Sequence, residues 1–227
     1  MPLVIGVAGS IATGKSHLAS YLVDRYDAVH LDVDQVVHRR YDPGTPSFDR
    51  VVEAFGPSVV APDDHIDRRA LGQLIFGSPE RTLALKDALG DWTVEVQAIV
   101  DEWRAELPHD RIAVLEAFNL VEMKFGAWCD VSWIVRTEPD IALRRILARN
   151  NLTEDEAHTR LAAARSWELR IHAIDRALDN NGTVEDFERT IDDALGETLE
   201  AYRAGTLPVS KGHQAASETG IPRGSSL

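Results

Sequence analysis

One stretch near the N-terminus decides which fold to expect: Gly9-Ser10-Ile11-Ala12-Thr13-Gly14-Lys15-Ser16. It fits the Walker A pattern G-x-x-x-x-G-K-[ST], and the apolar run 3–8 precedes it directly. A buried strand that leads into a glycine loop and then a helix is the context in which this pattern binds phosphate. The glycines allow the backbone to fold around an anion, and N–H groups at the helix start face its oxygens. The stretch therefore predicts a site for a nucleoside triphosphate.

Two side chains of this loop carry its chemistry. Lys15 is predicted to reach the β- and γ-phosphates of ATP, and Ser16 to offer a ligand for Mg²⁺. The alternative is a chance glycine turn, but all four fixed positions are filled and the strand and helix are in place. The loop predicts nucleotide binding without identifying the group that accepts the phosphate.

Length and composition are typical of one α/β domain with a sizeable core, since the 227 residues are 44% apolar and 27% charged. No run of about 18 apolar residues could cross a bilayer, and the first residues lead into a strand instead of a signal peptide. We therefore expect a cytoplasmic protein with no membrane partner. The single cysteine, Cys129, is interpreted as a small buried residue without catalytic chemistry.

The formal charge of −13 argues against general binding to nucleic acid. The basic residues are nevertheless concentrated locally, because 20 of the 24 are arginine and seven of these lie between Arg144 and Arg176. Planar guanidinium groups suit bidentate contacts with phosphate. The alternative, a solvated helical face balanced by neighbouring acids such as Glu154 and Glu168, stays open.

Alternating strands and helices predict the fold class, α/β with a doubly wound, five-stranded parallel sheet. Strands are expected at 3–8, 28–31, 111–116, 130–136 and 176–179. Helices are expected at 15–27, 47–55, 67–76, 79–107, 139–150, from 153 onward, and 184–199. The sequence thus places a long helical excursion between the second and third strands, and it predicts a disordered tail at 205–227, which is rich in Gly, Ser and Pro.

Two carboxylates, Asp32 and Asp34, come where the second strand ends. Ligands sit at the carboxyl ends of strands in open α/β sheets, so this location indicates a functional role for at least one of them. One of the two acids is expected to face the phosphates, while the other is free to cap the next helix, which is expected to begin near Gln35.

The chain resembles the dephospho-CoA kinase family of P-loop kinases, which add the 3′-phosphate in the last step of coenzyme A synthesis. The resemblance runs in order from Leu3 to about Ala194. It is carried by the strand and loop 4–16, the pair Asp32 and Asp34, and the runs 43–46, 54–56, 66–71 with Phe76, 145–150, 173–175 and 179–182. The loop is common to many kinases, whereas the ordered set with preserved spacing is far more specific.

The resemblance implies a role for each matched position. It implies ATP and Mg²⁺ as cofactors, with Lys15, Asp34 and Arg149 as catalytic residues, Asp34 being the base for the ribose 3′-hydroxyl. The implied ATP-binding residues are Gly9, Ala12, Thr13, Gly14, Lys15, Ser16, His17, Arg145, Asn180 and Gly182. The implied acceptor-binding residues are Asp32, Arg68 and Glu122, and the implied metal ligands are Ser16 and Asp34.

The resemblance also implies a domain plan. A single P-loop kinase domain covers 1–204, with its core at about 1–46 and 108–204, a helical acceptor-binding cap at about 47–107, and a lid at about 140–172. The expected partner is a small-molecule substrate, dephospho-CoA, and the expected state is a monomer or weak homo-oligomer.

Several positions depart from the family pattern. The family's arginine after the second aspartate is His38, the second arginine of its Asp-Arg-x-x-Leu-Arg run is Gly72, and its His-Pro pair is Gly90 and Asp91. The remaining departures are Phe118 and Asn119 in its Asp-x-Pro-Leu-Leu-x-Glu run, and Ala164 at its lid-proximal glutamine. These residues lie on the acceptor side or in the lid, whereas the nucleotide loop is intact.

Three functions remain open from the sequence. The first is a dephospho-CoA kinase, and the second is a P-loop kinase of another small hydroxyl-bearing metabolite or nucleoside. The third, a non-catalytic nucleotide-binding protein, is disfavoured because Lys15, Ser16, Asp34 and Arg149 are retained together.

Overall fold

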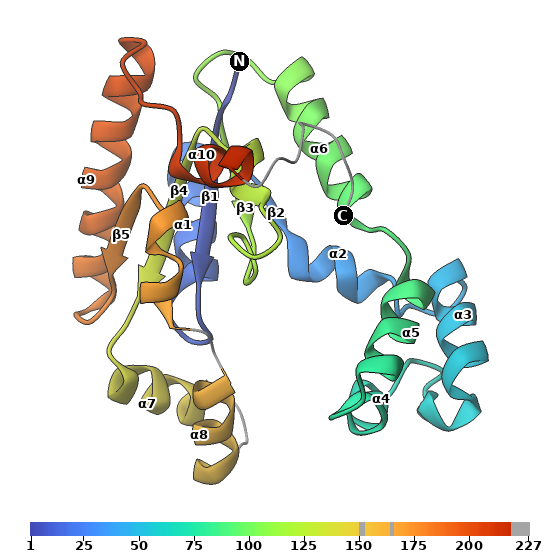
Figure 1. Cartoon of the computed structure of the whole chain (residues 1–227). Coiled ribbons are helices and arrows are strands. Elements are labelled where there is room, and N and C mark those ends of the chain that lie inside the picture. Colours follow the sequence, from blue (N-terminus) through green and yellow to red (C-terminus); the bar gives the residue numbers. More distant parts are fainter. Residues whose placement is uncertain (150–152, 164–165, 219–227) are drawn as a thin grey trace. The chain divides into compact units, whose positions relative to one another are not determined.

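The computed structural model describes residues 1–149, 153–163 and 166–218. Within this part of the chain, five parallel strands form one sheet in the order β2-β3-β1-β4-β5 (Figure 1). The strands are β1 (Leu3–Gly9), β2 (Val29–Asp32), β3 (Ile112–Glu116), β4 (Val131–Arg136) and β5 (Arg176–Asp179). The prediction of a doubly wound parallel sheet is confirmed, with each strand within one residue of its expected bounds.

Helices connect these strands as the alternating pattern predicts. They are α1 (Lys15–Tyr26), α2 (Val33–Arg39), α3 (Pro46–Phe55), α4 (Arg68–Ile75), α5 (Pro79–Leu89), α6 (Thr93–Glu106), α7 (Pro139–Arg149), α8 (Glu154–Ala163), α9 (Val184–Arg203) and α10 (Lys211–Glu218). Short 3₁₀ turns lie at η1 (Pro57–Val59), η2 (Phe125–Trp128), η3 (Trp167–Leu169) and η4 (Ile171–Ala173). None of the helices in the described ranges has the length and apolar character needed to cross a membrane.

The helix expected at 79–107 is interrupted. Gly90 ends α5 with a φ of 70°, in the left-handed region that favours glycine, and α6 begins three residues later at Thr93. The side chain of Asp91 accepts hydrogen bonds from the N–H and hydroxyl of Thr93, at 3.0 and 2.5 Å, which fixes the new helix start.

The prediction of a disordered tail from residue 205 is wrong for α10, and residues 219–227 lie outside the described part of the chain. Tertiary contacts order this helix. The Asp175 carboxylate accepts a hydrogen bond from the N–H of Lys211 at 2.8 Å, and the Ser210 hydroxyl donates to the carbonyl of Cys129 at 3.2 Å. Gly212 and Gly126 allow close approach, since a Cβ on Gly212 would lie 2.9 Å from the Gly126 backbone. Composition does not reveal such partners.

Contacts divide the described chain into two compact units. The first consists of Met1–Asp32 and the described residues from Val100 onward, and it contains the whole sheet. The second is Val33–Ile99, whereas the sequence placed the cap at about 47–107. The assignment of cap and lid roles stays a prediction.

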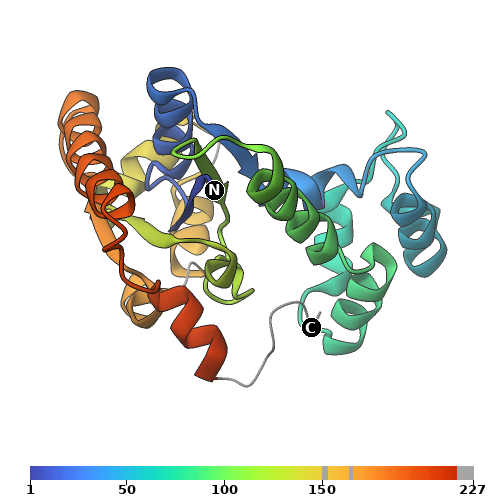
Figure 2. The same ribbon diagram turned by 90° about the horizontal axis from the view of Figure 1, so that it is seen from above.

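The core of the first unit is organised around the central strand β1. Its residues Leu3, Ile5 and Val7 pack on one face against apolar side chains of α1 and α9, among them Leu18 and Ile191. The opposite face is covered by the segment after β3 and by α10, so α1 and α10 lie on opposite sides of the sheet (Figure 2). Leu3, Ile5 and Val7 thus face one side of the sheet, and the residues between them face the other side. This alternation is expected for a strand that is buried on both faces.

The second unit has an apolar core of its own. Its buried residues, contributed by α3, α4, α5 and the turn around η1, are Val51, Val59, Ile66, Leu71, Ala88 and Leu89. Helix starts are fixed by side-chain caps, since Thr45 accepts from the N–H of Phe48 and Asp67 accepts from the N–H groups of Arg69 and Ala70. The unit therefore packs as a small helical body.

Candidate active site

The backbone of the glycine loop has the shape that the sequence predicts. Ala12 and Gly14 have φ values of 60° and 106°, and α1 begins at Lys15. A Cβ on Gly14 would lie 2.3 Å from the Asn180 amide nitrogen, and one on Gly9 would lie 2.7 Å from the Thr13 hydroxyl. Both glycines are therefore required by backbone geometry and by close contacts. Left-handed residues before a helix start turn successive N–H groups toward one point, where an anion binds.

Polar side chains from outside the loop hold its backbone in place. The Asn180 amide donates to the carbonyl of Thr13 at 2.8 Å, and the Thr137 hydroxyl donates to the same carbonyl at 3.2 Å. Arg145 donates to the Asn180 amide oxygen at 3.1 Å. Burial, and then the neighbouring Arg144 charge, lower the pKa of Arg145. The structure thus brings two predicted ATP-binding residues, Asn180 and Arg145, into contact with each other next to the Thr13 carbonyl of the loop.

Glu116 is a carboxylate that contacts Ser16, the last residue of the loop. It ends β3, is 4% exposed, and accepts a hydrogen bond from the Ser16 hydroxyl at 2.8 Å. His30 Nε2 lies 3.1 Å from its other oxygen. Burial alone would raise the pKa of Glu116, but hydrogen bonds with His30 and Ser16 and the charge of Lys15 outweigh it, so the pKa is lowered. Glu116 is therefore held as a carboxylate.

Lys15 is held close to the loop. Its ammonium donates to the carbonyl of Ser10 at 3.1 Å and lies 5.9 Å from the centre of the Phe118 ring. These contacts keep a positive charge at the loop. His17, by contrast, has its ring against Phe187 and 3.0 Å from Glu188 of α9, so its side chain faces α9.

The two strand-end aspartates belong to different units. Asp32 is the last residue of β2 and is paired in register with Glu116 on β3, which places two acids at the same edge of the sheet. Asp34 lies in the first turn of α2, within Val33–Ile99. The helix predicted near Gln35 therefore begins two residues earlier, immediately after β2.

Two of the predicted acceptor-binding residues, Glu122 and Arg68, have polar side-chain partners. Glu122 pairs with Arg170, whose Nε donates to it at 2.7 Å. In the second unit, Arg68 donates to His38 Nε2 at 2.7 Å, so Arg68 touches the residue that replaces a family arginine.

Two further predicted positions concern the ends of helices. Gly182 precedes α9, and a Cβ there would lie 2.8 Å from the Asp186 carboxylate, which caps that helix. Arg149 is the last residue of α7; its side chain and the whole of Ala164 lie outside the described part of the chain.

A family model for dephospho-CoA kinase matches residues 3–186, most of the chain. The chain belongs to the dephospho-CoA kinase family. The dephospho-CoA kinase of Symbiobacterium thermophilum is 36% identical over 183 residues, 80% of this chain and 75% of the relative. That of Geobacter sulfurreducens is 34% identical over 195 residues, 84% of this chain and 95% of the relative.

Solved structures support the fold. A crystal structure of a Thermus thermophilus protein superposes with a TM-score of 0.70 at 28% identity, covering 86% of this chain and 97% of that one. The dephospho-CoA kinase of Campylobacter jejuni superposes with a TM-score of 0.55 at 19% identity and the same coverage, which supports the fold. The predicted P-loop kinase fold is confirmed.

Sequence reasoning from the family pattern missed several polar residues at this site. Glu116 has a visible signal, an acid that ends an apolar strand, and the register places it beside Val7 of β1. His30, Thr137 and Arg170 give no such signal. Each reaches the site only because strands or turns far apart in the sequence become neighbours.

Proposed function

We propose that this protein transfers the γ-phosphate of ATP to the 3′-hydroxyl of dephospho-CoA, giving coenzyme A and ADP. The observation that carries the proposal is the intact loop, with Lys15, Ser16 and Glu116 at the carboxyl ends of adjacent strands, in a member of this kinase family. The bond from the γ-phosphorus to the β–γ bridging oxygen breaks, and a bond from the acceptor oxygen to that phosphorus forms. The hydroxyl proton leaves to a base.

The loop and Lys15 bind and orient the triphosphate. Backbone N–H groups from Ala12 to Ser16 meet phosphate oxygens, and the Lys15 ammonium offsets the charge that spreads over the transferring group. Asn180 and Thr137 keep the Thr13 carbonyl turned away from the anion, because both donate to that oxygen. A loop whose dipoles are already oriented needs little rearrangement during the reaction.

The residues present fit Mg²⁺. The Ser16 hydroxyl and the Glu116 carboxylate, 2.8 Å apart, form an all-oxygen donor set with negative charge, which a hard cation prefers. Ser16 and Asp34 are the proposed ligands from the family pattern, and Glu116 is in position to orient Ser16 or a bound water. When bound, Mg²⁺ would neutralise part of the negative charge of the triphosphate.

Asp34 is the proposed base. It lies two residues after Asp32 along the chain, next to the strand end where ligands bind in this fold class. A carboxylate accepts the hydroxyl proton as the new bond to phosphorus forms. Asp32, Arg68 and Glu122 are the proposed acceptor contacts.

We assign to the lid, at about 140–172, the role of excluding water from the bound nucleotide. Arg145 and Arg149 of α7 stand at the start of this segment, and planar guanidinium groups suit phosphate oxygens. Closing over the nucleotide removes the water that would otherwise hydrolyse ATP.

The test is a coupled assay of ADP release with ATP, Mg²⁺ and a panel of hydroxyl acceptors. We expect turnover that depends on dephospho-CoA, with coenzyme A as the product by mass spectrometry. Phosphorylation of another alcohol in place of dephospho-CoA would overturn the acceptor while leaving the kinase chemistry intact. ATP binding without transfer to any acceptor would favour a nucleotide-binding protein.

A further inference from the structure

Arg170 is a buried cation that the reaction described above does not use. It lies between η3 and η4 and is 1% exposed. Its Nε donates to the Glu122 carboxylate at 2.7 Å, and its guanidinium carbon lies 5.1 Å from the centre of the Phe118 ring. The contacts come from the segment that follows β3.

The other two nitrogens of this guanidinium have unused donors. Within the described residues, Nη1 and Nη2 of Arg170 are buried and have no hydrogen-bond partner. A buried charge with unmet donors is destabilising, and a buried ion pair is often replaced by apolar residues of similar volume without loss of stability. Packing alone therefore does not explain an arginine at this position. Two parallel N–H groups match the geometry of a phosphate.

Phe118 connects Arg170 with the loop. The Lys15 ammonium lies 5.9 Å from the centre of the same ring. One aromatic side chain thus contacts two cations, and one of them is the loop lysine.

We propose that Arg170 is a second phosphate-binding cation of the transfer site, which binds a phosphate oxygen of a substrate through Nη1 and Nη2 when the Phe118 ring moves aside. The inference rests on the proposed function, because that function supplies the two candidate sources, the triphosphate of ATP and the diphosphate of dephospho-CoA. The Glu122 carboxylate keeps the guanidinium oriented in both states. The ring keeps the donors covered until an anion replaces it.

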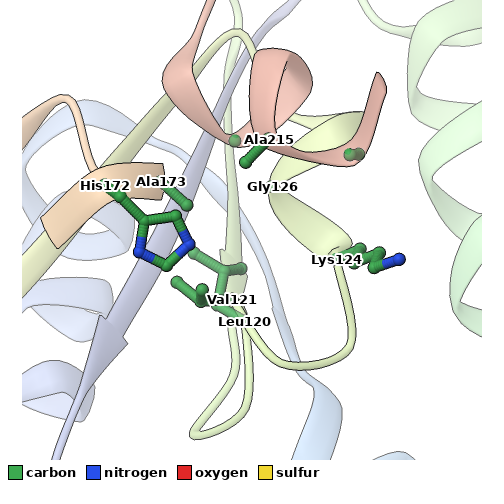
Figure 3. Close-up of a pocket in the computed structure, with 9 residues that line it drawn as sticks. Leu120, Val121, Lys124, Gly126, His172, Ala173 and Ala215 are labelled. Atoms are coloured by element: carbon green, nitrogen blue, oxygen red, sulfur yellow. The ribbon is translucent and has the colours of Figure 1, made fainter. Parts of the chain in front are cut away.

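The segment that carries Phe118 has room to move. A pocket of about 120 Å³, partly open to solvent, is lined by Leu120 and Val121 of this segment and by Ala215 of α10 (Figure 3). Its lining is mostly small or apolar side chains. Space beside a segment allows its side chains to repack at a lower cost than in a close-packed core.

The test compares variants that retain the fold. Arg170→Met combined with Glu122→Leu removes the pair as a unit, and Arg170→Lys keeps charge but loses the planar fork. Glu122→Gln keeps an acceptor for Nε and reports on Glu122 itself. The ion pair of Arg176 with Glu197, which is more exposed than that of Arg170 with Glu122, offers the matched control, Arg176→Met with Glu197→Leu. Binding of ATP with Mg²⁺ and of dephospho-CoA is measured separately by calorimetry, with melting temperatures recorded.

We expect the Arg170→Met, Glu122→Leu protein to melt near the wild-type temperature and to bind one substrate about tenfold or more weakly. The weakened substrate identifies the phosphate that Arg170 binds. Arg170→Lys should lose part of that affinity, Glu122→Gln should lose clearly less than the double variant, and the control pair should lose little.

Two outcomes overturn the proposal. One is affinity for both substrates within about twofold of wild type in a folded Arg170 variant. The other is a loss in Glu122→Gln as large as in the double variant, which would make Glu122 the binding group. If the double variant does not fold, the affinities of Arg170→Lys for the two substrates are compared with those of wild type by the same criterion. Wild-type protein that transfers nothing to dephospho-CoA would instead contradict the proposed function. The ATP affinity of the Arg170 variants would still test whether Arg170 binds a phosphate of ATP.

Discussion

The phosphate loop (residues 9–16) and the second unit (Val33–Ile99) both receive side-chain hydrogen bonds at backbone carbonyls, but these bonds serve different purposes. In the loop region, Asn180 and Thr137 donate to the carbonyl of Thr13, which would otherwise be a buried acceptor next to an anion site. In the second unit, Arg50 donates to the carbonyl of Ala88 at 2.7 Å and Arg40 to that of Leu89 at 3.0 Å. The last carbonyls of a helix lack partners within the helix, so these arginines stabilise the end of α5.

The difference teaches that a side-chain bond to a carbonyl has a functional effect only where the backbone it fixes does chemistry. Around Thr13 the fixed backbone is the phosphate loop, and around Leu89 it is a helix end. Similar losses of stability should therefore have unequal effects on turnover.

The largest effect is expected at the loop lysine. Lys15→Ala should retain the fold, weaken ATP binding and abolish measurable turnover, because losing one phosphate cation costs about 3 kcal/mol or more in the transition state. Steady-state kinetics and circular dichroism check this. Lys86→Ala in α5 is the control with an equal change of charge, and wild-type turnover in the Lys15 variant contradicts the assignment of the loop.

The next effect separates the two strand-end acids. Asp34→Asn should leave ATP binding in place and lower transfer by about two powers of ten or more, since an amide accepts no proton. Asp32→Asn should lower it less if Asp34 is the base. Rapid-quench measurement of coenzyme A formation compares the two. A larger loss in the Asp32 variant would exchange their roles.

A matched pair of substitutions tests the comparison directly. Asn180→Ala and Arg50→Met each remove a donor to a carbonyl, and each should lower the free energy of unfolding by about 1–3 kcal/mol. Only Asn180→Ala should also raise the KM for ATP, because only the Thr13 carbonyl belongs to the phosphate loop. Chemical denaturation and ATP kinetics on both proteins give the answer. Equal changes in KM would mean that the loop keeps its shape without Asn180.

The smallest effect concerns pH. The pKa of Glu116 is lowered in the folded protein, so its charged form stabilises the fold above its ordinary pKa of 4.5, and this contribution disappears as pH falls through the lowered value. The stability difference between wild type and Glu116→Gln should therefore be constant near neutral pH and shrink below pH 4.5. Melting temperatures across this range test it. Glu53→Gln, an exposed acid in α3, should show little difference at any pH.

The sequence by itself determined the framework of this protein. The glycine loop after an apolar strand fixed the start of the fold, because Gly9 and Gly14 adopt backbone conformations, and allow contacts, that other residues do not. Periodicity located the strands, and the ordered runs through Asn180 and Gly182 identified the kinase family. These features are local, so a linear pattern contains them.

Only the tertiary structure decided which polar side chains meet. Glu116 touches Ser16 because β3 pairs with β1, and His30 reaches Glu116 because β2 pairs with β3. Arg170 meets Glu122, 48 positions away in the chain, and α10 is ordered by Asp175 and Cys129. Composition and spacing carry no record of such pairs, because hydrogen bonds and burial depend on distance in space.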